Sequence, residues 1–442
     1  MSVTPIKLAS LSAMLLLMAA TGSQSAPAIT PPVVGDWPTF RGNAQHTGFV
    51  PVKVNLPLKL EWTWRGAATS IVSSPAISGS TVYIGTRDDA DRTGKAGSLI
   101  ALDLATGKLK WRYNKADAAH TINMRGAKSN TPPDPALDPD AVGGVDSSPA
   151  VAGGMVYFTT RDGALQAVTT DGKLKWRIRT GGGDKSSPAV ANGAIYIGSG
   201  YPNKDFWAVD AASGVVKWRT NSGLADPLLH RSGQFVYSSP AFLDGVVYAA
   251  ANDGGFYALD AASGKLKWRY ETGGGMYMHS PTIAGDVVVG APGDYDTSVY
   301  GVNRANGELL WKYNSGFEHS YVSSPAFDGS AVYICMGEPD QQMVALDAKT
   351  GKLKWKQPIG AAPRATYSSS PAVTNNVLFV GTAKLKRADP ESGRLIALDR
   401  ATGALLWHAD LPAEIVSSPA VAGHYVIVGC TDGSISAYTW NE

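Results

Sequence analysis

The sequence has little of several features that would place it in a familiar class. Only two cysteines occur among 442 residues, Cys335 and Cys430, so no disulfide framework supports the fold. The net charge is +2, and a nucleic-acid partner, which requires a strongly basic surface, is not expected. The chain also lacks CxxCH, HExxH, P-loop and GxSxG sequences. Attached haem, a zinc protease site, a nucleotide-binding loop and a serine hydrolase site therefore have no sequence support.

Long apolar runs are also missing beyond the N-terminus, so we expect no transmembrane segment in the mature chain. At the N-terminus, Lys7 precedes the apolar stretch 8–20, and small residues follow at Ser23, Ser25 and Ala26. This order is typical of a cleaved signal peptide, which we place at residues 1–25. A membrane anchor is the alternative, but the apolar stretch is short. We therefore expect a periplasmic or secreted protein.

Glycine and tryptophan are abundant, with 49 and 12 residues, and a repeat explains both. Ser-Ser-Pro or a close variant recurs roughly every 40–50 residues, with one longer interval. Each copy continues into a β-branched run and then into a second run that ends in a turn. The eight prolines are Pro75, Pro149, Pro188, Pro240, Pro281, Pro325, Pro371 and Pro419.

The turn of the repeat has a physical basis. In ALDAASGKLKW, Asp260 can accept hydrogen bonds from backbone amides, and Gly264 can adopt the positive φ that closes a bulged hairpin. The tryptophan four residues later lies on the last strand of its repeat. We expect it to pack between neighbouring sheets rather than to bind a ligand. The seven such residues are Trp111, Trp176, Trp218, Trp268, Trp311, Trp355 and Trp407.

Each repeat supplies four short strands, the content of one propeller blade. Eight repeats begin with the proline but only seven end with the tryptophan, because few residues follow Pro419. The segment LKLEWTW, with Trp62, has the spacing needed to supply the missing outer strand. The sequence therefore predicts an all-β, eight-bladed β-propeller of four-stranded antiparallel blades at residues 58–442, closed by the N-terminal strand and preceded by a lead-in segment at 26–57. An open solenoid and a seven-bladed ring are alternatives, which the strand count disfavours.

Departures from the repeat point to a binding surface. The insertions fall between second and third strands and between blades, so alternating strand direction brings them to one face of the disc. Residues just before each Ser-Ser-Pro should line the channel mouth on that face, where His279 replaces the first serine of its repeat. Solvated loop residues are the alternative interpretation. The candidates for binding a small polar ligand or an ion are Asp146, Lys185, His230, Arg231, Tyr237, Tyr277, His279, Glu318, His319 and Tyr321.

The module A-x-D-x-x-[ST]-G-x-x-x-W resembles the tryptophan-docking repeat of pyrroloquinoline-quinone (PQQ) type propellers. It is complete at Ala101–Trp111, Ala208–Trp218, Ala258–Trp268, Ala345–Trp355 and Ala397–Trp407. The segment DWPTFRGNAQHTGF, residues 36–49, resembles the W-P-x-F-R-G…T-G lead-in of bacterial PQQ-like repeat proteins. The resemblance covers nearly all of the mature chain and implies the propeller fold.

The same resemblance implies two functions. Quinoprotein alcohol dehydrogenases hold PQQ and Ca²⁺ at the channel mouth, but they usually carry a vicinal cysteine pair, which is absent here. The outer-membrane assembly propeller is non-catalytic, but its lipid-anchoring cysteine is also missing. We favour a binding or scaffold module whose loop-rich face meets a protein, glycan or small polar ligand. The alternative is a compact PQQ-dependent oxidoreductase acting on an alcohol or sugar.

Overall fold

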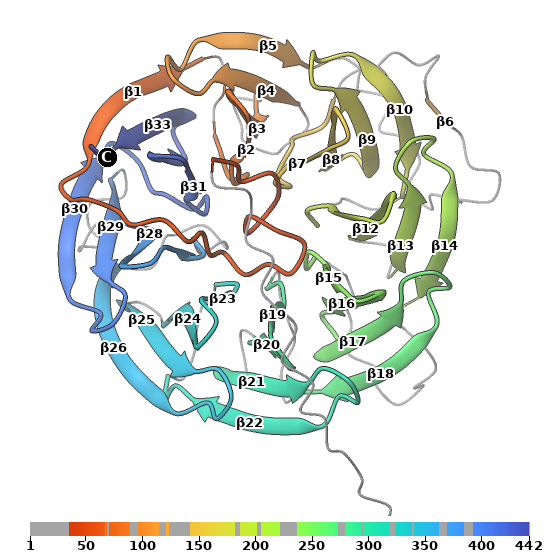
Figure 1. Ribbon diagram of the computed structural model, residues 1–442. Coiled ribbons are helices and arrows are strands. Elements are labelled where there is room, and N and C mark those ends of the chain that lie inside the picture. The colour runs from red at the N-terminus through yellow and green to blue at the C-terminus, as the bar shows by residue number, and fades with distance from the viewer. Residues whose placement is uncertain are drawn as a thin grey trace, which may run out of the picture.

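The computed structural model describes residues 35–66, 68, 70–88, 96–114, 121–122, 142–181, 186–200, 205–221, 237–272, 279–292, 296–317, 323–337, 340–361, 369–383 and 392–441. These residues form a ring of eight antiparallel, four-stranded blades around a central channel, as expected from the repeat (Figure 1). The described part of the chain is all β, and within it no helix is long and apolar enough to cross a membrane.

The first four blades follow one another along the chain, each from its innermost to its outermost strand. Blade 1 consists of β2 (Ala76–Ser78), β3 (Thr81–Arg87), β4 (Gly97–Asp103) and β5 (Leu109–Tyr113). Blade 2 consists of β7 (Ala150–Ala152), β8 (Met155–Thr160), β9 (Ala164–Thr169) and β10 (Leu174–Arg179), and β6 (Thr121–Ile122) adds a short parallel strand to β10. Blade 3 consists of β11 (Ala189–Ala191), β12 (Ala194–Gly198), β13 (Asp205–Asp210) and β14 (Val216–Asn221). Blade 4 consists of β15 (Ala241–Leu243), β16 (Val246–Ala250), β17 (Gly255–Asp260) and β18 (Leu266–Glu271).

The remaining blades continue around the ring in the same way. Blade 5 consists of β19 (Thr282–Ala284), β20 (Val287–Gly290), β21 (Ser298–Asn303) and β22 (Leu309–Asn314). Blade 6 consists of β23 (Ala326–Phe327), β24 (Ala331–Met336), β25 (Asp340–Asp347) and β26 (Leu353–Ala361). Blade 7 consists of β27 (Ala372–Val373), β28 (Val377–Ala383), β29 (Gly393–Asp399) and β30 (Leu405–Leu411). Blade 8 consists of β31 (Ala420–Ala422), β32 (Tyr425–Gly429), β33 (Ser434–Thr439) and β1 (Lys59–Arg65).

Blade 8 closes the ring by joining the two ends of the chain. The N-terminal strand β1 pairs antiparallel with β33, from Lys59 opposite Thr439 to Arg65 opposite Ser434. Figure 1 shows β1 completing the gap between β30 and β5 at the rim. The prediction that an N-terminal strand supplies the missing outer strand is confirmed. Closure removes the open sheet edge on which another chain could pair.

Adjacent blades are held together at the rim by tryptophan. In blade 3, the indole N–H of Trp218 donates to the carbonyl oxygen of Ala261 in blade 4 at 2.8 Å. Its ring lies over Gly264, where an added Cβ would come within 2.6 Å of the indole. Trp62, Trp111, Trp176, Trp268, Trp311 and Trp355 make the same two contacts with the next blade. Trp407 meets no such turn, because the last two strands of blade 8 come from opposite ends of the chain; it packs edge-on against Tyr438 instead.

Around the channel, the second serine of each Ser-Ser-Pro links its blade to the next. Its backbone N–H donates to the side-chain oxygen of the corresponding serine in the following blade, at 2.9–3.1 Å. The bond from Ser418 to Ser74 completes the circle. In order, the eight serines are Ser74, Ser148, Ser187, Ser239, Ser280, Ser324, Ser370 and Ser418. All are nearly buried, so each bond satisfies a backbone donor that water cannot reach.

The two faces of the disc differ. Because strands alternate in direction, the turns between first and second strands and between third and fourth strands lie on one face, which we call the turn face. The connections between second and third strands and between blades leave from the other, the loop face. The predicted insertions belong to loop-face connections, and most of their residues lie outside the described part of the chain.

Candidate functional site

The candidate site at the loop face is represented by three described residues. Asp146, Tyr237 and His279 precede the inner strands of blades 2, 4 and 5. The serine bond between blades 4 and 5 places the starts of those two inner strands side by side, so Tyr237 and His279 belong to one part of the rim and Asp146 to another. The other candidates, Lys185, His230, Arg231, Tyr277, Glu318, His319 and Tyr321, lie outside the described residues.

Asp146 is engaged in ion pairs rather than presented to the channel. Both of its carboxylate oxygens accept hydrogen bonds from the guanidinium of Arg87, each at 2.7 Å, and Arg161 lies 3.7 Å away. The Asp146 side chain is fully buried. Arg87 ends β3 of blade 1 and Arg161 follows β8 of blade 2, so this carboxylate ties two blades together.

His279 takes the place of a serine with a defined structural role. In blade 4, the hydroxyl of Ser238 accepts from the N–H of Ala250 and donates to its carbonyl oxygen, at 3.0 and 2.6 Å. His279 makes no hydrogen bond with another described residue. Its burial lowers its pKa to about 4, so the imidazole is neutral at pH 7.

Ion pairs also anchor the connections between second and third strands on the loop face. A basic residue that follows tryptophan on an outer strand pairs with an aspartate near that connection. Arg112 pairs with Asp88 at 2.7 Å, Arg269 with Asp253 at 3.4 Å and Arg65 with Asp432 at 3.0 Å. Arg177 with Asp162, Arg219 with Asp205 and Lys312 with Asp296 make the corresponding pairs. The margin of the loop face therefore carries charged side chains that are paired with one another.

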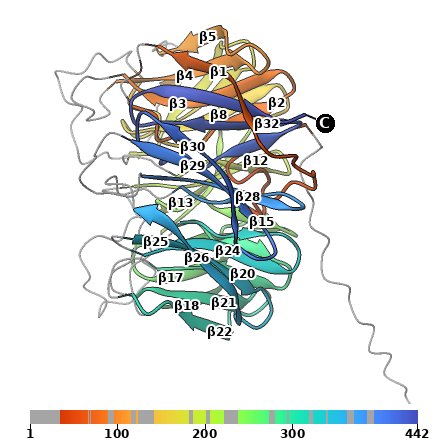
Figure 2. The ribbon, with the colours of Figure 1, turned by 90° about the vertical axis from the view of Figure 1, so that its left-hand side faces the viewer.

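The lead-in segment closes the other mouth of the channel. Figure 1 shows it crossing the centre of the ring, and Figure 2 shows it on one side of the disc. Its backbone carbonyls accept hydrogen bonds from inner strands at 2.7–3.0 Å. In each of the following pairs the first residue supplies the carbonyl oxygen and the second the N–H: Trp37 and Ile77, Pro38 and Val151, Ala44 and Phe242, Gln45 and Ile283, Thr47 and Phe327, Gly48 and Val373.

Three polar side chains of the lead-in segment reach deeper into the channel. The Thr39 hydroxyl, a guanidinium nitrogen of Arg41 and Nδ1 of His46 bond the carbonyl oxygens of Pro188, Pro325 and Pro281, at 3.4, 3.1 and 3.2 Å. These prolines belong to the Ser-Ser-Pro copies of blades 3, 6 and 5. The segment therefore satisfies carbonyls that the repeat leaves pointing inward.

Burial changes the pKa values of two side chains in the lead-in segment. Arg41 and His46 are both 1% exposed. Desolvation lowers the pKa of Arg41 to about 9 and that of His46 to about 3, so His46 is neutral at pH 7. Burial also raises the pKa of the Cys335 thiol to about 12, which leaves it unreactive.

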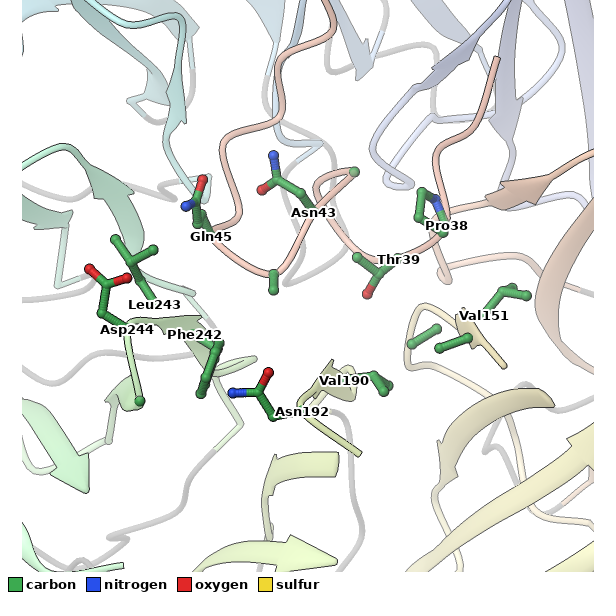
Figure 3. Close-up of a pocket in the computed structure, with 15 residues that line it drawn as sticks. Pro38, Thr39, Asn43, Gln45, Val151, Val190, Asn192, Phe242, Leu243 and Asp244 are labelled. Atoms are coloured by element: carbon green, nitrogen blue, oxygen red, sulfur yellow. The ribbon is translucent and has the colours of Figure 1, made fainter. Parts of the chain in front are cut away.

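A pocket of about 610 Å³ opens on the turn face between the lead-in segment and blades 2, 3 and 4. Figure 3 shows Val151, Val190 and Phe242 along one side and Thr39 and Asn43 of the lead-in segment opposite. The sequence did not predict this pocket. The glycines of the lead-in were a signal for sharp changes of direction, and Gly42 and Gly48 do adopt φ of +80° and +59°. The path of the lead-in segment is fixed by six backbone hydrogen bonds, and these leave no pattern of side chains in the sequence.

Comparison with known proteins gives the family. The family model described as "Outer membrane protein assembly factor BamB" matches residues 129–235, 231–385 and 365–441, together more than half of the chain. The chain belongs to this BamB-like family of PQQ-type propellers. BamB from Shewanella oneidensis (strain MR-1) is 40% identical over 63 residues, which cover 14% of this chain and 14% of that protein. The match therefore spans much less than two thirds of that relative's length.

Solved structures of two kinds share the BamB-like propeller fold. Quinohemoprotein alcohol dehydrogenase from Comamonas testosteroni superposes with a TM-score of 0.69 at 18% identity, covering 92% of this chain and 80% of the other. BamB from Moraxella catarrhalis gives a TM-score of 0.60 at 15% identity, covering 87% and 100%. A europium-containing methanol dehydrogenase gives 0.66 at 15% identity, covering 92% and 98%. At these identities the likeness concerns the fold alone.

Among the described residues, the rim of this BamB-like propeller offers no set of side chains that could hold a calcium ion. Calcium takes six to eight oxygen ligands. Asp146 is the carboxylate among the three described candidates, and Arg87 binds both of its oxygens. Within the described ranges, no group of three or more His, Cys, Asp or Glu side chains is placed to hold a metal ion.

Proposed function

We propose that this protein is an exported scaffold that binds a partner protein through its loop face and carries no catalytic cofactor. Export is supported by the signal-like sequence of residues 1–25. Recognition of a protein is supported by the family model, whose description names an assembly factor.

The observation that carries the proposal is the difference between the two mouths of the channel. The lead-in segment closes the turn-face mouth through backbone hydrogen bonds to six blades. The connections that are long in sequence leave from the opposite face, where paired charges hold the strand ends in place. A rigid ring with elaborated connections on one face suits recognition of a macromolecule.

A cofactor assay tests the non-catalytic part. The purified protein is mixed with PQQ and Ca²⁺, and absorbance and dye-coupled oxidation of alcohols are followed. We expect neither a stoichiometric spectral change nor turnover from protein with intact β-sheet circular dichroism. A spectral change accompanied by turnover would establish the alternative, a PQQ-dependent oxidoreductase.

Site-specific cross-linking tests the binding face in cells. A photo-reactive phenylalanine analogue replaces Tyr237 on the loop face or, as a matched control, Thr402 in the exposed turn of blade 7. We expect a discrete cross-linked partner band from position 237 and none from position 402. Equal yields from both positions would contradict the assignment of the face. His279→Ser, which restores the serine of the repeat, should lower the yield from position 237; an unchanged yield would remove His279 from the site.

A further inference from the structure

We propose that the turn-face pocket binds an extended peptide, which pairs with the inner strand β11 of blade 3 in the way that residues 48–54 of the lead-in segment pair with blade 7. This site lies on the face opposite the proposed partner surface and does not depend on that proposal.

The first observation is an open position in a series of hydrogen bonds that six of the eight blades make. In six blades, the middle residue of the inner strand donates its N–H to a carbonyl of the lead-in segment. Val190 holds this position in blade 3, because its pairing with Ile195 matches the pairing of Phe242 with Val247 in blade 4. Among the described residues, no backbone carbonyl accepts from Val190. Val421 of blade 8 is in the same situation but is fully buried, whereas Val190 is half-buried and lines the pocket.

The lead-in segment leaves blade 3 open because it bends there. The N–H of Gly42 donates to the carbonyl oxygen of Thr39 at 2.9 Å, and Arg41 and Gly42 adopt φ of +61° and +80°. Residues 40–43 therefore turn back on themselves instead of running along β11. The hydroxyl of Thr39 reaches blade 3, at the carbonyl oxygen of Pro188. In Figure 3 the lead-in ribbon stands away from Val190 and Asn192.

Blade 7 shows how such an inner strand holds an extended chain. Val373 donates to the carbonyl oxygen of Gly48 and accepts from the N–H of Val50, at 2.7 and 2.9 Å, in a parallel bridge centred on Phe49. In the turn that follows, Asn375 N–H donates to the carbonyl oxygen of Val52 at 2.9 Å. The Asn376 carboxamide then binds both the N–H and the carbonyl of Val54, each at 2.9 Å.

Blade 3 presents the backbone part of this arrangement with no described residue bound to it. Gly193 stands in the place of Asn376, so the carboxamide of Asn376 has no counterpart. Val190 stands where Val373 stands, and Asn192 follows it by two residues, as Asn375 follows Val373. Asn192 is exposed at the pocket and makes no hydrogen bond with another described side chain. Addition of a strand to such an edge is a common way for proteins to bind peptides, since the backbone supplies affinity and pockets read side chains.

The walls of the pocket define the peptide. Pro38, Val151 and Phe242 are apolar, and the carboxylate of Asp244 is paired with Arg304 at 3.0 Å. A segment with mainly apolar side chains fits these walls. The lead-in sequence GFVPVKV, residues 48–54, occupies the equivalent position in blade 7 and supplies a probe of the right kind.

Amide hydrogen exchange of the full mature chain tests the open edge. We expect the Val190 amide of the free protein to exchange at least about tenfold faster than those of Val151 and Phe242, which are bonded to the lead-in segment. Adding the capped peptide Ac-GFVPVKV-NH₂ should slow exchange at Val190 and shift the resonances of Asn192. Equal protection of all three amides in the free protein, or no change at Val190 with saturating peptide, would overturn the proposal.

Variants separate this pocket from other peptide sites. Ala152→Trp fills the pocket from blade 2 and should abolish binding, whereas Ser78→Trp, at the same position of the inner strand of blade 1, should bind as the unmodified protein does. If Ala152→Trp does not fold, Asn192→Gly keeps the positive φ of the turn, removes the carboxamide, and should weaken binding several-fold. Equal binding by Ala152→Trp or Asn192→Gly, or equally tight binding of N-acetylvaline methylamide, would contradict an extended-peptide site.

Discussion

The eight blades and the lead-in segment belong to one chain but are stabilised in different ways. Neighbouring blades meet through side chains at fixed positions. The indole of Trp218 packs on Gly264, and the hydroxyl oxygen of Ser239 accepts a hydrogen bond from the backbone N–H of Ser187. The lead-in segment meets the blades mainly through its backbone, at six inner strands. A side-chain contact that recurs leaves a repeat in the sequence, whereas a backbone contact leaves none.

The largest expected effect separates ring closure from channel closure. A chain starting at Lys59 lacks the lead-in segment but keeps β1, whereas a chain starting at Gly66 lacks both. We expect the first to fold as a monomer with a lower melting temperature. The second leaves β33 without its partner and should aggregate or lose cooperative unfolding. Size-exclusion chromatography and thermal circular dichroism compare the two, and equal melting temperatures would show that β1 is dispensable.

Within the ring, Gly264→Ala should be strongly destabilising. The added Cβ would lie 2.6 Å from the indole of Trp218, at a φ of +69°. Overpacking and left-handed strain together predict a loss of about 2–5 kcal/mol in the free energy of unfolding, measured by urea denaturation. Gly285→Ala is the matched control, since its φ is +68° and its Cβ would meet nothing within 4 Å. A loss no larger than that of the control would show that the glycine is required only for its backbone conformation.

The serine ring should contribute less at each position. Ser239→Ala removes the acceptor of the Ser187 N–H, a buried donor that is bonded at 2.9 Å. An unsatisfied buried donor costs about 1–3 kcal/mol, so urea denaturation should show a loss of that size. Ser263→Ala, in an exposed turn of blade 4, is the control and should cost less. The reverse order would mean that water replaces the serine at the channel.

The lead-in segment should make stability depend on pH through His46. Its folded-state pKa of about 3 lies below the usual 6.5, so the unfolded chain binds a proton that the folded protein does not. Stability therefore falls as pH decreases below about 6.5, by about 1 kcal/mol between pH 7.5 and 5.5 for this group. His279, with a pKa of about 4, adds a loss of the same sign.

His46→Asn tests this contribution, because asparagine tolerates the positive φ of 60° at this position. The variant should lose about 1 kcal/mol less than the original protein over the same pH interval. Unfolding free energies measured at several pH values give the slope. Identical slopes would mean that His46 is protonated in the folded protein or that the channel admits water.

Part of the candidate site could be predicted from sequence. Asp146 and His279 were correctly placed just before inner strands, because the position of Ser-Ser-Pro fixes where each strand begins. The ion pair of Asp146 with Arg87 could not be predicted, since the two residues lie 59 positions apart and belong to different blades. Neither could the buried Arg41 and His46, whose surroundings come from blades 5 and 6.

The sequence alone determined the number of blades, the strand that closes the ring and the residues that join neighbouring blades, because these depend on contacts that recur between adjacent modules around the ring. Only the tertiary structure decided which mouth of the channel is closed, which acidic side chain is paired and where an inner strand remains open. Those features depend on backbone groups and on single contacts between distant residues. Such interactions occur once and therefore have no period by which a sequence could reveal them.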